Sequence, residues 1–275
     1  MAPASLSIAV VGDDVAHGVL GRSFVDAVLS ARGSAPLCRR WWLEDGGAVD
    51  LRGCSDGYYR AKDVRADLRQ LKGLPSGRSL HLRRRREGKV VVGDSAFDDV
   101  FQLFGLLSDD GPDLIVMLRD TDGEADRRTP AIPVLDELDP VARPARMVVG
   151  LPHPEAEGWF ILSMEAPPAD RLAVARKTLG FDPTQAPERL RSSGDANDAK
   201  RVLQFLTFHA EALARAPSRA LPREQLESLL DGLHERLDDL RQRGQGCGLG
   251  AFLDALERDL TERLRELDTG APATR

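Results

Sequence analysis

The amino-acid sequence predicts an α/β protein, in which a largely parallel sheet is flanked by helices and followed by an α-helical C-terminal extension. Short apolar segments at 6–12, 113–119 and 146–151 each precede a turn or a helix, an order that is typical of parallel sheets. From about residue 168 onward, Leu-rich stretches with helical spacing replace these segments. We therefore predict an α/β domain over residues 1–167 and a helical extension over residues 168–275.

The chain is expected to begin with a strand, a helix and a second strand. The segment "LSIAVVG" (6–12) is an apolar run that ends in Gly and Asp, and residues 16–33 have apolar positions at helical spacing up to Gly33. A second strand is predicted within "APLCRRWWLED". There the adjacent Trp41 and Trp42 would point to opposite faces of the sheet.

The next elements alternate between helix and strand. The segment "YYRAKDVRADLRQLKGLP" (58–75) predicts a helix that Gly and Pro terminate. A hairpin that turns at Glu87 and Gly88 is predicted in "SLHLRRRREGKVVVGDS", and "AFDDVFQLFGLLSDDG" predicts an amphipathic helix. The strand "PDLIVMLRDTD" follows, and residues 145–163 read as a strand, a Pro-rich break and a helix from near Glu155.

The C-terminal part has the pattern of a helical protein. Helices are predicted at 170–180, 196–215, 222–243 and 249–268. The last two form a predicted helical hairpin around "GQGCGLG". Its apolar side would pack on the sheet or on another subunit, so these helices are a candidate surface for a homo-oligomer.

Composition limits the classes of function. The 38 Lys and Arg residues against 44 Asp and Glu give a net charge of −6, so a polyanion would need a local basic patch or metal ions. Three scattered cysteines argue against a disulfide framework and a structural zinc site. No stretch has the roughly 20 apolar residues of a membrane span, and no signal peptide is apparent. We expect a reduced, cytoplasmic protein without a membrane partner.

Two aspartates follow the predicted strand at 113–119. Asp120 and Asp122 would lie beyond its carboxyl end, where parallel sheets bind ligands, and alternation would place them on the same side. Two nearby carboxylates repel each other, and Mg²⁺ relieves that repulsion because it prefers carboxylate oxygens. The alternative is that both acids cap a turn, since Asp-x-Asp-Gly is a common turn sequence.

Acids also follow the other two predicted strands. Asp13 and Asp14 come after the first strand, and Glu155 and Glu157 come after the third, so carboxylates would converge at one edge of the sheet. His153 is a candidate metal ligand, or its His-Pro-Glu segment simply marks the start of a helix. The remaining histidines, which lack the spacing of zinc motifs, are His17, His81, His209 and His234.

These motifs together resemble a known family. The segments "IAVVGDD", "LIVMLRDTDGE" and above all "GLPHPEAEGWFIL" resemble the TOPRIM-like DUF4276 family, which is related to OLD-type nucleases. The later "GFDPTQAPERL" and "DANDAKRVL" resemble its Asp-Pro segment and downstream Lys, so the likeness spans about residues 5–210. The resemblance implies a TOPRIM/Rossmann-like fold for the α/β domain.

The resemblance also implies roles for the acids. Asp120, Asp122 and Glu157 would hold one or two Mg²⁺ or Mn²⁺ ions, and Glu155 or Glu157 would complete the catalytic set. The family's first motif is Val-Val-Glu-Gly, whereas this chain has Gly12 in the place of the Glu. Asp13 would then act as the acid/base carboxylate from one residue later.

Basic residues provide candidates for nucleic-acid contact. They are Arg83, Arg84, Arg85, Arg86 and Lys200. Arginine suits phosphate oxygens, but consecutive arginines in a strand face both sides, so only half would line one groove. The alternatives are a solvated hairpin whose charges protect a sheet edge, and a surface lysine on a helix.

The resemblance implies Mg²⁺-dependent hydrolysis of phosphodiesters in DNA or RNA. The context would be prokaryotic defence or a mobile element, with a separate ATPase subunit, because OLD-type nucleases work with an ATPase part that this chain lacks. The alternative is a catalytically inactive TOPRIM-like subunit that joins a larger complex through its C-terminal helices.

Overall fold

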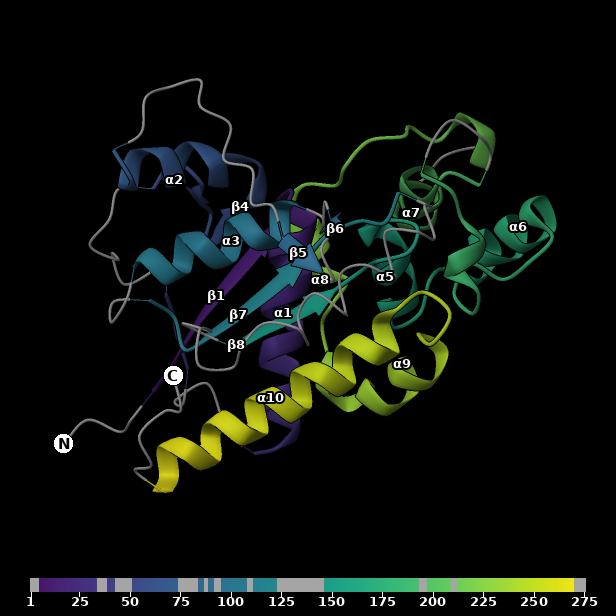
Figure 1. The fold of residues 1–275 in the computed structure, drawn as a ribbon. Helices are drawn as coiled ribbons and strands as arrows, with labels where there is room; N and C mark the ends of the chain where they lie inside the picture. The colour runs from purple at the N-terminus through teal and green to yellow at the C-terminus, as the bar shows by residue number, and fades with distance from the viewer. Residues whose placement is uncertain are drawn as a thin grey trace.

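The computed structural model shows a mostly parallel mixed sheet with helices on both faces (Figure 1). The structure describes residues 5–33, 39–42, 51–73, 84–86, 89–91, 95–107, 111–122, 146–192, 197–208 and 212–269. The predicted α/β class with a C-terminal helix is confirmed.

The sheet is built around three adjacent parallel strands. β1 (Leu6–Gly12) pairs with β7 (Leu114–Leu118), which pairs with β8 (Arg146–Gly150). In this register Gly12, Leu118 and Gly150 lie in one row. The three strands therefore end at the same edge of the sheet, as the sequence predicts.

Shorter strands extend the sheet on the other side of β1. β2 (Arg39–Trp41) pairs in parallel with the first half of β1, and β4 (Tyr58–Arg60) with its last residues. β3 (Cys54–Ser55) pairs antiparallel with β4 and completes the order β3-β4-β1-β7-β8.

The helices and their bounds are as follows. They are α1 (Val15–Ala31), α2 (Val64–Leu71), α3 (Ser95–Leu106), α5 (Ala156–Ser163), α6 (Ala169–Leu179), α7 (Ala199–Thr207), α8 (Arg223–Ser228), α9 (Leu237–Arg243) and α10 (Leu249–Thr269). Single 3-10 turns occur at Ala61–Asp63, Pro187–Arg189, Leu213–Arg215 and Leu233–Glu235.

Alternating residues of the central strands bury two separate cores. Ile8 and Val10 face a core shared with α1, α5 and α10, whereas Ala9 and Val11 face a core shared with α2 and α3. Trp41 and Trp42 are both buried, one in each core, so the prediction of opposite faces is confirmed. This alternation is what a sheet covered by helices on both faces requires.

The C-terminal helices pack on the same core as the strands. Phe252 and Leu256 of α10 belong to the core that also contains Val116 of β7 and Val148 of β8. In Figure 1, α10 runs across one side of the sheet and α9 lies against it. The predicted boundary between residues 167 and 168 stays a prediction.

Three predicted helices are shorter or differently placed in the structure. The one predicted at 196–215 ends at Thr207, because Phe208 has an extended backbone, and Leu213–Arg215 form a separate 3-10 turn. Residues 58–60 form β4 rather than the start of a helix, because Tyr59 pairs with Val11 of β1. The predicted helix at 222–243 is interrupted, because Gly232 adopts a left-handed conformation with φ of 68°. The hairpin is present as β5 (Arg84–Arg86) and β6 (Lys89–Val91), paired antiparallel.

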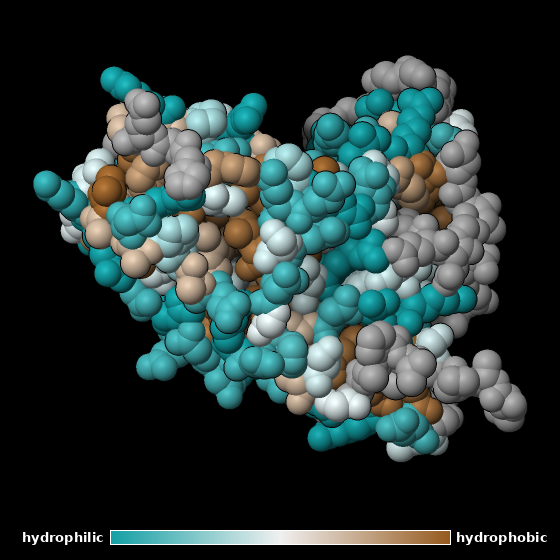
Figure 2. All heavy atoms as spheres, turned by 180° about the vertical axis from the view of Figure 1, so that it is seen from behind, coloured by the Kyte–Doolittle hydropathy of each residue, from teal (hydrophilic) through white to brown (hydrophobic). Residues whose placement is uncertain are grey.

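The outer surface is mainly hydrophilic on the face opposite to Figure 1. Among the coloured residues in Figure 2, hydrophilic ones predominate, with groups of hydrophobic residues between them. In the part of the chain that the structure describes, no helix combines the length and the apolar character needed to cross a bilayer.

Candidate functional site

The candidate site lies where β1, β7 and β8 end. Asp13 follows β1, Asp120 follows β7 after Arg119, and Glu155 is the residue just before α5. These ends point toward α5 and α7, beyond the arrowheads of β7 and β8 in Figure 1. We call Asp13, Asp120, Glu155 and Glu157 the acidic cluster.

Asp120 is the central member of the acidic cluster. Its Oδ1 accepts a hydrogen bond from the backbone N–H of Ala156 at 2.7 Å and lies 3.0 Å from Nε2 of His17. The first contact satisfies an N–H group at the start of α5, where the helix dipole favours an anion. Both contacts are made by one oxygen, and no partner of Oδ2 is found among the described residues.

His17 links two strand ends through both nitrogens of its ring. It is only 1% exposed, with Nδ1 at 2.8 Å from Asp14 and Nε2 at 3.0 Å from Asp120. Carboxylates accept hydrogen bonds and do not donate them, so the ring donates at both nitrogens and is an imidazolium. Burial acts to lower the pKa of His17, but the carboxylates of Asp120 and Asp14 raise it well above its ordinary value.

Asp14 has two roles at the start of α1. As the N-cap residue its side chain accepts the backbone N–H of His17, and its Oδ1 also contacts the His17 ring. Burial acts to raise the pKa of Asp14, but the hydrogen bonds and charge of His17 lower it to about 2. Asp14 is therefore a fixed anion that holds His17 in place.

Glu155 is buried beside Lys200. Its side chain is 5% exposed, and Oε1 accepts a hydrogen bond from Lys200 at 3.2 Å. Its Oε2 is buried and makes no hydrogen bond with any residue that the structure describes. Burial raises the pKa of Glu155 to about 7, although the Lys200 ammonium acts to lower it.

Two further carboxyls share this environment. Burial raises the pKa of Glu157 to about 7, with contributions from the charges of Asp120 and Glu155 and opposition from Lys200. Burial also raises the pKa of Asp13, which the charges of His17 and Arg119 oppose. Burial of these carboxyls therefore outweighs the effect of the cations beside them.

Asp122 is placed differently from Asp120. β7 ends at Leu118, and Asp122 takes a left-handed backbone conformation with φ of 50°, so strand alternation does not extend to it. Its carbonyl oxygen accepts a hydrogen bond from Ser192 at 3.3 Å. Its role as a metal ligand stays a prediction.

His153 belongs to the support of the site. Its Nδ1 lies 2.8 Å from Oγ1 of the fully buried Thr121, and the His153–Pro154 peptide is cis. The backbone N–H of Thr121 also donates to the carbonyl of Pro152 at 3.0 Å. These bonds tie the segment after β7 to the segment after β8.

The predicted basic residues lie in two places. Lys200, near the start of α7, contacts the acidic cluster. Arg84, Arg85 and Arg86 form the strand β5, and Arg83 lies outside the described residues. Whether these arginines contact nucleic acid stays a prediction.

The donor set and charge of the acidic cluster fit a divalent cation. Carboxylate oxygens are the ligands that Mg²⁺ prefers, and Glu155 Oε2 is a buried acceptor without a partner. Within the described ranges, no three Asp, Glu, His or Cys side chains are arranged to hold one ion together. Mg²⁺ does not require three, because it commonly keeps several waters and binds through one or two carboxylates.

Spacing alone did not identify His17 as part of the site. His17 does not have the spacing of a zinc motif, so the sequence assigns it no role. In the structure it contacts both Asp14 and Asp120, which follow β1 and β7. The spacing of Asp14 and His17 does predict their contact, because residues three apart at the start of a helix lie on the same face. Its second partner, Asp120, is 103 residues away in sequence.

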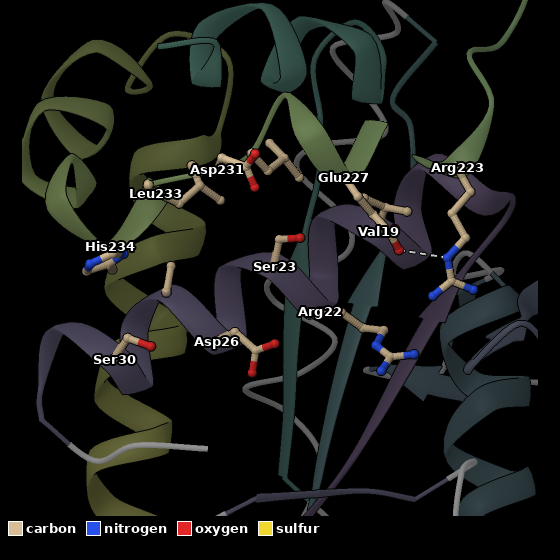
Figure 3. Close-up of a pocket in the computed structure, with 13 residues that line it drawn as sticks. Val19, Arg22, Ser23, Asp26, Ser30, Arg223, Glu227, Asp231, Leu233 and His234 are labelled. Carbon is tan, nitrogen blue, oxygen red and sulfur yellow. Dashed lines mark hydrogen bonds and ion pairs between the residues drawn. The ribbon is translucent and has the colours of Figure 1, made fainter. Parts of the chain in front are cut away.

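A separate pocket lies beside α1. Its volume is about 380 Å³, and Figure 3 shows residues of α1 such as Ser23 and Asp26 on one side and Asp231 and Leu233 on the other. It contains none of the residues that the sequence predicts for the site.

Comparisons of the chain with protein-family models, with curated proteins and with solved structures give no match.

Proposed function

We propose that the chain is a Mg²⁺- or Mn²⁺-dependent enzyme that hydrolyses phosphodiester bonds in DNA or RNA. The main supporting observation is the convergence of Asp120, Glu155 and Glu157 at the carboxyl edge of the sheet, with the buried Oε2 of Glu155 lacking a partner. Ligand sites of parallel sheets lie at this edge. Carboxylates held close together with raised pKa values are typical of functional sites.

Asp120, Glu155 and Glu157 are the residues that would hold the ion, with Asp122 as a further candidate. A bound divalent ion polarises a phosphate, lowers the pKa of water and offsets negative charge near a polyanion. Asp120 would bind through Oδ2, because its Oδ1 is engaged by His17 and Ala156.

Other groups would handle protons and phosphate. Asp13 lies at the exposed rim with a raised pKa, which suits a carboxylate that accepts a proton from water. Lys200 is 30% exposed, so its ammonium can hold Glu155 and still approach a phosphate oxygen. The arginines of β5 are further candidates for phosphate contact.

The sequence resemblance adds support for this reading. In a TOPRIM-like fold, acids after adjacent parallel strands would meet at one edge, and the order of β1, β7 and β8 agrees with that arrangement. We also expect the context that the resemblance implies. It comprises a defence or mobile-element role, an ATPase partner, a cytoplasmic location and self-association through the C-terminal helices.

The alternative is a catalytically inactive subunit that keeps the fold and binds other proteins. It is favoured by Gly12, which replaces the family's Glu, and by His17 and Lys200, which already bring two cations to the acidic cluster. In this reading the two cations stabilise the buried acids without any metal ion.

Cation binding and nuclease activity together test the proposal. The full chain is titrated with Mg²⁺ and Mn²⁺ by calorimetry, and cleavage of plasmid DNA and of RNA is followed. We expect binding and cleavage by the wild type, and loss of both in the Asp120→Asn and Glu157→Gln variants. Asp238→Asn, at a side chain 98% exposed on α9, is the matched control and should behave as wild type.

Each negative result has a defined meaning. Cleavage that survives in Asp120→Asn and in an Asp120→Ala/Asp122→Ala double variant would contradict the assignment of these acids. An absence of any cation binding by the wild type would favour the interaction subunit.

A further inference from the structure

The start of α1 lies against Gly12, where the nearest atom to a side chain at position 12 would be Cβ of His17. A Cβ added to Gly12 would lie 2.4 Å from Cβ of His17, closer than such atoms approach, and at a tight 3.3 Å from its Cγ. The glutamate that the resemblance places at position 12 therefore cannot coexist with His17 in this conformation. The missing Cβ of Gly12 is thus what lets α1 begin this close to the end of β1.

The His17 ring enters the site from α1 and is fixed there by geometry. Asp14 holds Nδ1 at 2.8 Å while the same aspartate caps the helix, so the position of the ring is tied to the start of α1. Its Nε2 then reaches Oδ1 of Asp120 at 3.0 Å.

These contacts fix the orientation of the Asp120 carboxylate. Oδ1 is held between Nε2 of His17 and the N–H of Ala156, which come from α1 and α5. A carboxylate held through one oxygen on two sides cannot rotate freely, so its other oxygen is directed elsewhere. Groups that hydrogen-bond a ligating side chain in this way set its geometry and its affinity for metal.

We propose that His17 is the positioning residue of the site, which aims the Asp120 carboxylate by holding its Oδ1 through Nε2. This inference rests on the proposed function, because it concerns how Asp120 presents an oxygen to a divalent cation. His17 touches neither the ion nor the substrate in this role. It acts through Asp120 alone.

Two substitutions of His17 separate positioning from packing. The amide nitrogen of Gln is as many bonds from Cβ as His Nε2, so His17→Gln can still donate to Asp120. The amide nitrogen of Asn matches Nδ1, so His17→Asn can donate only to Asp14. Both variants lose the ring and its charge, so a residue that only filled space would be affected similarly by both.

The measurement is the affinity of the full chain for Mn²⁺ by calorimetry, with thermal unfolding in the absence of metal as the check on folding. We expect His17→Asn to weaken binding by about 10- to 100-fold, the usual effect of removing a group that orients a metal ligand. We expect His17→Gln to stay close to wild type, and the unfolding temperatures of the two variants to be similar.

A second pair of variants serves if the His17 variants do not fold. Asp14→Asn and Asp14→Ser lose the same charge and keep a helix-capping residue, but only Asn is long enough to hold Nδ1 of His17. We expect Asp14→Ser to bind Mn²⁺ more weakly than Asp14→Asn.

The outcomes separate this inference from the proposed function. Equal Mn²⁺ affinity in both members of either pair would overturn the positioning role while leaving the metal site in place. No binding by the wild type would overturn the proposed function and this inference together.

Discussion

At the scale of single residues, the candidate site depends on two that do not look catalytic in the sequence. Gly12 leaves room for Cβ of His17, and the His17 ring is held by Asp14 and Asp120. The acids that the motifs do indicate, Glu155 and Glu157, have pKa values near 7 because they are buried together. Both features can be tested without any assumption about a substrate.

The first prediction concerns Gly12. Gly12→Ala should lower the free energy of unfolding by about 1–3 kcal/mol, the usual cost of forcing extra atoms into a packed site. The atom it meets, Cβ of His17, cannot move aside by a change of rotamer. Urea denaturation measures the loss.

Gly158→Ala is the matched control for Gly12→Ala. An added Cβ at Gly158 would meet its nearest neighbour, Pro187, at an ordinary 3.5 Å, and Ala is favoured over Gly inside a helix. Its stability should equal or exceed that of the wild type. Equal stability of Gly12→Ala and wild type would contradict the close packing of Gly12 on His17.

The second prediction concerns the pH dependence of stability. The pKa values of Glu155 and Glu157 rise from 4.5 to about 7, so between these values the folded chain binds more protons than the unfolded chain. The free energy of unfolding should therefore fall as pH rises from 5 to 8. The raised pKa of His17 acts in the same direction above pH 6.5, because only the unfolded state then loses its proton.

Urea denaturation at several pH values checks this prediction. Glu157→Gln cannot ionise and should flatten the decline, whereas Asp238→Asn should keep the wild-type slope. A Glu157→Gln variant with an unchanged slope would show that Glu157 does not titrate in this range.

At the scale of elements, α10 joins the C-terminal part to the sheet. Phe252 of α10 is 2% exposed, and its ring centroid lies 5.2 Å from Trp159 of α5 and 6.0 Å from Phe24 of α1. Trp159 also donates from Nε1 to the carbonyl of Cys247 at 2.9 Å, just before α10. Helices from both predicted domains thus meet in one aromatic group.

The third prediction tests whether this contact stabilises the whole fold. Phe252→Ala should lower the free energy of unfolding by about 3–5 kcal/mol, the range for large buried aromatic residues. Phe208→Ala, at a residue 38% exposed, should cost much less. Circular dichroism and tryptophan fluorescence in urea measure both variants.

The number of unfolding transitions shows whether the α/β domain and the C-terminal helices unfold together or separately. We expect both probes to report a single transition that shifts to lower urea in Phe252→Ala. A second transition that keeps its wild-type midpoint would show that residues 1–167 fold independently of the C-terminal helices.

At the scale of the whole molecule, a bound cation would link the site to global stability. The acids that would hold the ion follow different strands of one sheet, so an ion that binds only the folded chain stabilises all of it. Burial raises the pKa of Glu155 and of Glu157 to about 7, so protons compete with the ion at these two acids.

The fourth prediction is that Mn²⁺ raises the unfolding temperature, and raises it more at pH 8 than at pH 6. At a Mn²⁺ concentration about 100 times the Kd, the free energy of unfolding should rise by about 2.7 kcal/mol. Thermal unfolding with and without Mn²⁺ measures it, and Asp120→Asn should abolish it at both pH values. A gain that is equal at pH 6 and pH 8 would contradict the competition with protons.

Much of this molecule follows from its sequence alone. The apolar runs before Asp13, Asp120 and Glu155 predict parallel strands, and parallel strands place their following residues at one edge. The edge and its acids are therefore determined by local patterns. The helix predicted at 58–75 is present as α2, but it begins at Val64, because Tyr59 and Arg60 pair with β1.

Only the tertiary structure decided how the acids are held. The contact of Asp120 with His17 spans 103 residues, and that of Glu155 with Lys200 spans 45. No local pattern indicates which cation meets which acid, because that depends on how the strands are ordered and how α1, α5 and α7 pack over them. For the same reason, the sequence shows only that Gly12 stands where the resemblance expects a glutamate. The structure shows that a side chain at position 12 would collide with Cβ of His17.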